Sequence, residues 1–500
     1  MVHMRRNGGR PSAIIVGALA GTLMMLAACS GSDSGTYSPP APHQGAPNQG
    51  APDQPLPSPG VGPEVDADRE PQSTFAIDID TASYNYARRL ILDGARPDAS
   101  TIRPEEFVNA FRQDYPQPSG NGFAVALDGA RMPSAHEAPS ETRLLRVGLQ
   151  TRAQDETRRP DAALTFVVDV SGSMSETGRL DLVQDALHTL IDQLRDTDSV
   201  AIVAYQSDAT VLREMTAVSS RSSLHRAVDA LEAGGSTNLE AGLVTGYQVA
   251  RAGFVRGATN RVILLSDGLA NTGNTNANAI LAQIREEAAK KIALLGVGVG
   301  SEYGDALMER LADEGDGFVT YVSEREQARD LFVHRLPATL TVRALDAKVQ
   351  VTFDPSTVAT YRLIGYENRS LNPEDFRNDR VDGGEVGPGH SVTALYVIRL
   401  RSEAVGTVAQ ARVRWLDPLG REAQEVAATI SVSDLAGDFA GASPRTRLDY
   451  VAAFFAERLR RSEYADAVSL SSLEDMAEDA YRDTGDQQAQ ELAELIRRSD

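Results

Sequence analysis

Residues 163–173 read ALTFVVDVSGS, and this stretch decides the fold. The nearly continuous apolar run from Ala163 to Val168 predicts a strand that is buried on both faces, as in sheets with helices on either side. Asp169, Ser171 and Ser173 follow the run directly. We therefore expect these oxygen-bearing side chains at the carboxyl end of the strand, which is where open α/β sheets bind their ligands.

Strand-like and helix-like segments alternate on either side of this stretch, from about residue 160 to residue 336. Alternation of this kind predicts an α/β doubly wound sheet with mostly parallel strands. The predicted strands cover residues 163–168, 199–205, 262–265, 292–299 and 318–322. The predicted helices cover residues 178–194, 239–254, 278–290, 306–312 and 325–336.

Three loops of this domain carry oxygen ligands. The first holds Asp169, Ser171 and Ser173, the second holds Thr237, and the third holds Asp267. Carboxylates and hydroxyls are hard ligands, which suit Mg²⁺, Ca²⁺ or Mn²⁺ better than zinc or copper. A single Asp-x-Ser-x-Ser run could be only a helix N-cap, but this explanation does not cover three loops at once.

This pattern resembles the metal-ion-dependent adhesion site (MIDAS) of von Willebrand factor A (vWA) domains, over residues 160–336. The resemblance implies that Ser171, Ser173 and Thr237 bind the metal directly and that Asp169 and Asp267 act mainly through bound water. It also implies a Rossmann-like fold and Mg²⁺ as the metal, with Ca²⁺ or Mn²⁺ as alternatives. A carboxylate from a protein partner would then fill an exchangeable coordination position.

The amino-terminal residues predict export and a lipid anchor. A basic start with Arg5, Arg6 and Arg10 precedes an apolar run that is short for a membrane-spanning helix. The run ends in Leu26-Ala27-Ala28-Cys29, which resembles a bacterial lipobox, and Cys29 is the only cysteine. We expect residues 1–28 to be a signal peptide and Cys29 to carry the acyl chains in the cell membrane or outer membrane. The alternative is an uncleaved anchor with a chance cysteine.

The composition of the chain excludes some classes of binding partner. Residues 29–72 are rich in Pro, Gly, Ser and Gln and predict a disordered linker. The net charge of −21 argues against nucleic acid and against direct binding to anionic lipid, so the expected contact with the membrane is the lipid anchor alone.

The regions that flank the vWA-like domain resemble those of the bacterial YfbK-like vWA lipoproteins. The resemblance rests on four segments: Phe75–Tyr84, Arg103–Phe111, Asp114–Pro118 and Gly384–Tyr396. Strand-like segments occur both before and after the vWA-like domain, and we expect them to form one sandwich into which that domain is inserted. The predicted strands lie at residues 123–127, 144–149, 340–344, 349–353, 392–400 and 408–416.

The predicted organisation also includes helical parts near both ends. Helices are expected near residues 84–92 and from residue 103, and the apolar spacing of Leu448, Val451 and Phe455 predicts a core helix in the tail. The expected regions are the signal peptide 1–28, the linker 29–72, an amino-terminal region 73–159, the vWA-like domain 160–336, a β-rich domain 337–434 and a helical region 435–500.

The sequence contains no zincin, Walker or nucleophile-elbow motif, so we expect a binding protein rather than an enzyme. A structural envelope scaffold with a stabilising metal is one alternative. A metal-dependent hydrolase is another, with Glu240 as the nearest carboxylate outside the motif for a general base.

Overall fold

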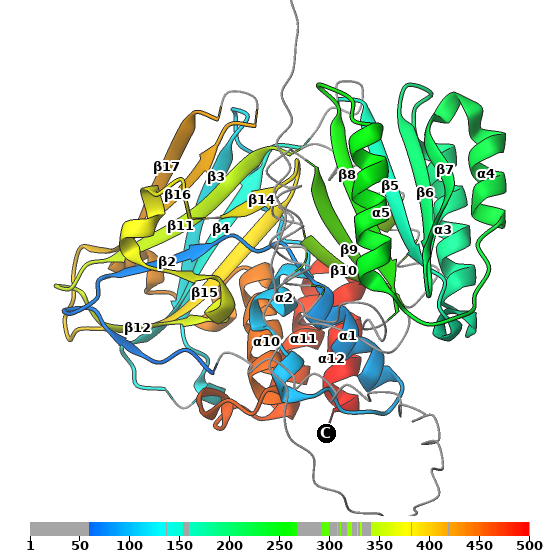
Figure 1. Ribbon diagram of the computed structural model, residues 1–500. Coiled ribbons are helices and arrows are strands. Elements are labelled where there is room, and N and C mark those ends of the chain that lie inside the picture. The colour runs from blue at the N-terminus through cyan, green and yellow to red at the C-terminus, as the bar shows by residue number, and fades with distance from the viewer. Residues whose placement is uncertain are drawn as a thin grey trace, which may run out of the picture. The chain divides into compact units, whose positions relative to one another are not determined.

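The computed structural model describes residues 60–136, 138–153, 160–267, 292–299, 318–322, 342–381, 383–418 and 421–499, with isolated positions between 308 and 332 (Figure 1). The expected signal peptide, Cys29 and the linker up to residue 59 lie outside the described residues. So do the helix expected at 278–290 and most of those expected at 306–312 and 325–336. Among the described helices, none combines the length and apolar character needed to cross a membrane.

The central sheet has six strands in the order β10-β9-β8-β5-β6-β7. All neighbours pair in parallel except β7, which runs antiparallel to β6 at the edge. The doubly wound α/β prediction is therefore confirmed, with one additional edge strand. The strands are β5 (Ala162–Asp169), β6 (Ser199–Tyr205), β7 (Ala209–Ala217), β8 (Thr259–Ser266), β9 (Ala293–Val299) and β10 (Phe318–Val322).

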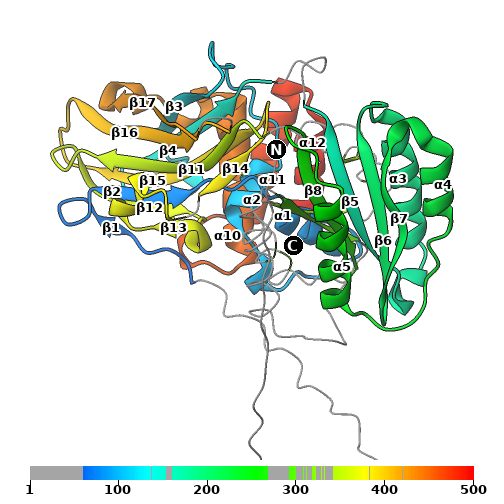
Figure 2. The same cartoon turned by 45° about the horizontal axis from the view of Figure 1, so that its top comes forward.

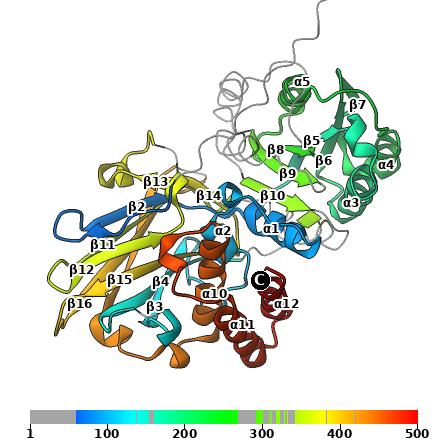
Figure 3. The same cartoon turned by 90° about the horizontal axis from the view of Figure 1, so that it is seen from below.

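Described helices cover both faces of this sheet. Helices α3 (Leu180–Gln193) and α4 (Arg221–Asp229) share a core with Phe166 and Val168 of β5. Helix α5 (Leu239–Ala252) packs on the other face, against Val167. Figure 3 shows the strands between α5 and α3. Alternate residues of β5 thus enter two different cores, which explains why the strand has no polar face.

The strands before and after the central domain form one sandwich, as expected. Its first sheet has the order β1-β12-β15-β4-β3 and its second β13-β2-β11-β16-β17, with β14 paired to β11. Val147, Val349 and Tyr396 belong to the core between them. The strands that precede the central domain are β1 (Val65–Asp66), β2 (Gln72–Ala76), β3 (Phe123–Arg131) and β4 (Thr142–Thr151). Those that follow are β11 (Ala344–Phe353), β12 (Val358–Ile364), β13 (Ser370–Leu371), β14 (Gly384–Val386), β15 (Ser391–Leu400), β16 (Thr407–Leu416) and β17 (Ala423–Ser431).

A layer of helices packs on the other face of the first sheet (Figure 2). Leu144 of β4 and Leu395 of β15 enter this helical core, together with Phe107 and Phe454. The tail helix predicted from its apolar spacing is therefore part of the core. The helices are α1 (Ala82–Leu92), α2 (Pro104–Asn109), α10 (Pro444–Leu459), α11 (Leu470–Thr484) and α12 (Gln487–Arg498).

Two boundaries differ from the expectation. Strand β1 lies inside the range expected to be linker, because Val65 and Asp66 pair with β12 and the neighbouring Ala67 is fully buried. The strand expected at 340–344 instead begins at Ala344 and continues through the next expected strand as β11. A bulge between Leu345 and Lys348 interrupts the alternation that separated the two in the sequence.

Candidate metal site

The candidate site lies at the carboxyl ends of β5 and β8. These strands pair directly, so Val168 lies opposite Leu265 and the loops that follow them begin side by side. After β5 the chain continues to β6 on one side of this pair, and after β8 it continues to β9 on the other side. The pair is therefore the topological switch point of the fold. The loop after β5 continues into a short 3₁₀ turn, Gly172–Ser175, before α3 begins.

Ser173 joins two other predicted ligands, because its hydroxyl lies within hydrogen-bond distance of both. Ser171 Oγ lies 3.1 Å from Ser173 Oγ, and Ser173 Oγ lies 2.9 Å from Asp267 Oδ1. Neighbouring ligands of an octahedral Mg²⁺ with bonds of 2.0–2.1 Å are separated by about 2.9 Å. The spacing and the donor chemistry of this cluster therefore fit a small divalent cation.

The loop that carries Thr237 is fastened to the first loop by backbone hydrogen bonds. Gly172 N donates to Gly235 O at 3.1 Å, and Gly234 N donates to Val170 O at 2.7 Å. Gly235 has a φ of +77°, and a Cβ there would lie 2.5 Å from the Gln206 side chain, so a glycine suits this close approach. Thr237 is 5% exposed within the same loop.

Asp169 is fully buried and has a partner for each oxygen. Its Oδ1 accepts from Ser171 N at 2.9 Å, and its Oδ2 accepts from Ser266 Oγ at 2.7 Å and Tyr205 OH at 3.2 Å. Burial raises the pKa of Asp169, while the hydrogen bonds from Ser171 and Ser266 oppose that rise. Tyr205 and Ser266 thus hold the carboxylate in a fixed orientation at the base of the cluster.

Asp267 is held between a hydroxyl and a guanidinium. Its Oδ1 accepts from Ser173, and its Oδ2 accepts from Arg179 Nη1 at 2.5 Å. Arg179 also donates to the Ser173 carbonyl oxygen at 3.3 Å and pairs with Glu176 at 2.8 Å. Sequence reasoning gave no role to Arg179, Tyr205 or Ser266, although Tyr205 ends a predicted strand and Ser266 directly follows one, in the third loop.

The donor set differs from that of a carboxylate-rich or zinc site. Within the described part of the chain, no three His, Cys, Asp or Glu side chains gather as a metal-binding group. The candidate site instead combines hydroxyls with two aspartates. Glu240, the base considered for a hydrolase, lies in the first turn of α5, after the Thr237 loop.

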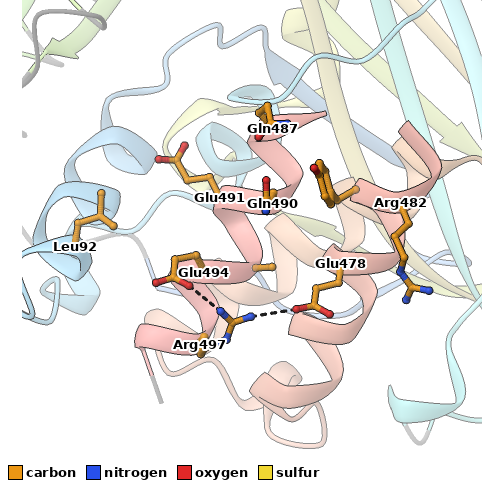
Figure 4. A pocket seen from close by; sticks show the side chains of 10 residues that line it. Leu92, Glu478, Arg482, Gln487, Gln490, Glu491, Glu494 and Arg497 are labelled. Atoms are coloured by element: carbon orange, nitrogen blue, oxygen red, sulfur yellow. Dashed lines mark hydrogen bonds and ion pairs between the residues drawn. The ribbon is translucent and has the colours of Figure 1, made fainter. Parts of the chain in front are cut away.

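A hollow of about 600 Å³ also lies in the helical layer, along α11 and α12 (Figure 4). Arg497 there pairs with Glu494 at 2.8 Å and with Glu478 at 3.1 Å. None of the five predicted ligands lines this hollow, and the paired charges leave it without an evident ligand chemistry.

Three family models match the chain. Residues 163–334 match the von Willebrand factor type A domain, residues 338–500 match the C-terminal region of the uncharacterized protein YfbK, and residues 61–145 match a model described as von Willebrand factor.

The chain is also similar to individual proteins. The uncharacterized protein YfbK of Escherichia coli (strain K12) is 31% identical over 460 residues, which is 86% of this chain and 78% of that one. Human inter-alpha-trypsin inhibitor heavy chain H3 is 26% identical over 33% of this chain and 19% of its own length. A solved von Willebrand factor type A structure from Catenulispora acidiphila, 17% identical, covers 75% of this chain and 89% of that one with a TM-score of 0.47.

Proposed function

The chain belongs to the family of YfbK and contains its vWA domain and YfbK-type C-terminal region, and from this we propose that it binds a protein partner through a divalent metal ion. The observation that carries the proposal is that Ser173 Oγ lies within 3.1 Å of both Ser171 Oγ and Asp267 Oδ1, which come from two loops. In this proposal Ser171, Ser173 and Thr237 hold the ion, with Asp169 and Asp267 beside it. Mg²⁺ is the expected ion, and Ca²⁺ or Mn²⁺ would suit the same oxygens.

The charges around the site favour an acidic partner group. Asp169 and Asp267 contribute two negative charges, and the buried guanidinium of Arg179 contributes one positive charge. The hydroxyl ligands contribute none, so the buried groups and a divalent cation together carry a net charge of about +1, while the charge of Glu176, the exposed partner of Arg179, is screened by solvent. Ser173 is exposed, so the site is open to solvent on its side. A carboxylate from another protein is the chemistry that this opening would accept.

The first experiment measures metal binding directly. We expect the folded chain to bind Mg²⁺ in isothermal titration calorimetry. We expect Ser173→Ala and Asp169→Ala to weaken binding at least tenfold, because the first removes an oxygen of the cluster and the second removes the carboxylate at its base. Asp438→Ala is the matched control, since Asp438 is an exposed aspartate outside the central domain. Wild-type protein without measurable affinity for Mg²⁺, Ca²⁺ or Mn²⁺ would refute the metal site.

The second experiment separates binding from scaffolding. Partner capture from cell-envelope extracts should require Mg²⁺, be abolished by EDTA and be lost in Asp169→Ala but not in Asp438→Ala. If metal raises the melting temperature while capture survives EDTA and Asp267→Ala, the metal only stabilises the fold and the adhesion proposal is rejected.

The proposed site of action is the bacterial cell envelope. The lipobox-like Leu26-Ala27-Ala28-Cys29 supports acylation at Cys29, which would anchor the chain to the cell membrane or outer membrane. Cells fed a labelled palmitate analogue should label the wild-type chain and not Cys29→Ser. Equal labelling of both chains would exclude Cys29 as the lipidated residue.

A further inference from the structure

Arg179 places a buried positive charge beside the candidate metal site. The residue is 4% exposed and lies immediately before α3, at the end of the loop that carries Ser171 and Ser173. Its guanidinium contacts Asp267, the Ser173 carbonyl and Glu176. A cation next to a cation site opposes metal binding, so any benefit of Arg179 to the site comes from the groups that it positions.

The two carboxylate oxygens of Asp267 have different partners, because Arg179 contacts only one of them. Oδ2 accepts the hydrogen bond from Arg179 at 2.5 Å, and Oδ1 faces the Ser173 hydroxyl at 2.9 Å. A charge-assisted contact of this kind is strong when both groups are buried, and the side chains of Arg179 and Asp267 are 5% and 2% exposed. Only Oδ1 of Asp267 is therefore directed toward the hydroxyl cluster.

Arg179 is itself fixed on the other side. Its Nη2 pairs with Glu176 at 2.8 Å, and its Nη1 donates to the Ser173 carbonyl, within the ligand loop. The planar guanidinium thus connects the loop after β5 to the first residue after β8. A rotation of Asp267 that brought Oδ2 to the cluster would break its contact with Arg179.

We propose that Arg179 is a positioning residue that holds Oδ2 of Asp267 away from the metal and turns only Oδ1 toward it, as a partner for bound water, so that a coordination position stays open for the partner's carboxylate. This inference rests on the proposed metal-dependent function and adds how the open position is maintained. The inference implies that the site binds the metal more weakly than it would if Oδ2 of Asp267 also reached the ion, because fewer anionic ligands hold the ion more weakly. In return, one coordination position stays exchangeable.

The test compares Arg179→Gln with wild type in the full folded chain, using Mg²⁺ calorimetry and Mn²⁺ water-proton relaxation. We expect Arg179→Gln to bind Mg²⁺ about tenfold more tightly, because a like charge is removed and Oδ2 becomes available. The Mn²⁺ complex should have one fewer inner-sphere water. Arg221→Gln, on the surface of α4, is the matched control and should change neither quantity.

A double-mutant cycle identifies the route of the effect. If Arg179 acts through Asp267, Arg179→Gln should no longer change the inner-sphere water number when Asp267→Asn is already present. Unchanged or weaker Mg²⁺ binding with an unchanged water number in Arg179→Gln overturns the proposal and leaves Arg179 a packing residue. If that variant does not fold, Arg179→Lys is tested in its place. Its single ammonium cannot hold Asp267 and the Ser173 carbonyl in the same way, so affinity should rise two- to threefold.

Failure of this inference is distinct from failure of the proposed function. A wild-type chain that binds neither Mg²⁺ nor Mn²⁺ refutes the metal site, and the role of Arg179 falls with it. A wild-type chain that binds both ions, with an Arg179→Gln variant that is no different, refutes only the role of Arg179.

Discussion

Glu105 is a buried carboxylic acid of the helical layer. It lies in the first turn of α2 and is 1% exposed, and neither of its carboxyl oxygens has a hydrogen-bond partner. Burial, together with the nearby charges of Glu367 and Asp78, raises the pKa of Glu105 to about 8. The folded chain therefore carries this side chain as a neutral acid near pH 7.

A pKa that is higher in the folded chain makes stability depend on pH. The folded state binds a proton that the unfolded state releases above about pH 4.5, so the free energy of unfolding should fall by about 1.4 kcal/mol per pH unit up to about pH 8. Glu105→Gln should remove most of this slope. Urea unfolding of both proteins at pH 5 and pH 8.5 measures the slope, with Glu422→Gln, which replaces an exposed glutamate, as control. Equal slopes for wild type and Glu105→Gln would contradict the prediction.

The ligands of the candidate site were visible in the sequence because hydroxyls and carboxylates followed recognisable strands. The structure brings Ser171, Ser173 and Asp267 together, as the alternation of strands and helices indicated. Arg179 carried no such signal, because an isolated arginine at the start of a helix is usually solvated. Its partner Asp267 is 88 residues away along the chain, and only the folded sheet places the two side by side.

At the scale of elements, α3 and α4 are joined by a chain of four side chains. His188 Nδ1 of α3 lies 2.7 Å from His225 Nδ1 of α4, and each Nε2 lies 3.1 Å from an aspartate, Asp229 for His188 and Asp192 for His225. An ionised aspartate only accepts, so each Nε2 carries its hydrogen. One further proton between the two Nδ1 atoms then completes all three hydrogen bonds.

This chain predicts energetic coupling between the two histidines. His188→Ala and His225→Ala should each lower the free energy of unfolding by about 1–2 kcal/mol, and the double variant should lose less than the sum. A double-mutant cycle by urea denaturation measures the coupling. His390→Ala, outside the central domain, provides a comparison. Additive losses would show that the two rings pack without sharing a proton.

Helix α5 approaches the sheet closely through glycine. A Cβ at Gly242 would lie 2.7 Å from the ring of Tyr205, and one at Gly246 would lie 2.3 Å from Val167. Tyr205 donates to Asp169, so a displaced ring would disturb the carboxylate at the base of the candidate site.

We therefore expect Gly242→Ala to weaken Mg²⁺ binding several-fold and to lower the melting temperature, because the Tyr205 ring must move. Gly441→Ala is the control, since a Cβ there meets nothing within 4 Å. Calorimetry with Mg²⁺ on both variants measures the difference. A Gly242→Ala chain with wild-type affinity would show that Tyr205 does not set the position of Asp169.

Two elements of the central domain escaped sequence reasoning for physical reasons. Strand β7 is an edge strand in which no residue is fully buried, so it shows no apolar run. Helix α4 has nine residues and only three buried positions, Leu224, Ala227 and Val228. The apolar pattern of the sequence indicates elements such as β5, which is buried on both faces, and α3, which buries a long row of apolar side chains.

At the scale of the whole molecule, one sandwich is built from chain on both sides of the central domain. Alternation revealed its strands, but not that β15 pairs with β4 across more than two hundred residues, with Val392 opposite Leu149. The alternation of residues along one strand indicates which of its faces is apolar. Which strand pairs with it depends on contacts that form only in the folded chain. The insertion could therefore be inferred from the sequence, while the strand order could not.

A buried ionic cluster joins the two flanks of this molecule. Arg146 of β4 pairs with Asp128 of β3 at 2.7 Å and with Asp449 of α10 at 3.0 Å, and Gln113 donates to the same Asp449 at 2.8 Å. The side chains of Arg146 and Asp449 are 5% and 1% exposed. Burial raises the pKa of Asp449 to about 6 although Arg146 acts in the opposite direction.

Removal of the arginine alone should destabilise the whole folded chain. Arg146→Ala would leave Asp449 buried without its charge partner, and we expect a loss of about 3–5 kcal/mol in the free energy of unfolding. Arg377→Ala is the matched control, because Arg377 pairs with Glu425 at 3.0 Å on the surface, where such pairs contribute about 0–1 kcal/mol. Urea denaturation compares the two, and combining Arg146→Met with Asp449→Leu should recover part of the loss by removing both charges. Equal losses for Arg146→Ala and Arg377→Ala would mean that apolar packing, rather than this ion pair, joins the helical layer to the sandwich.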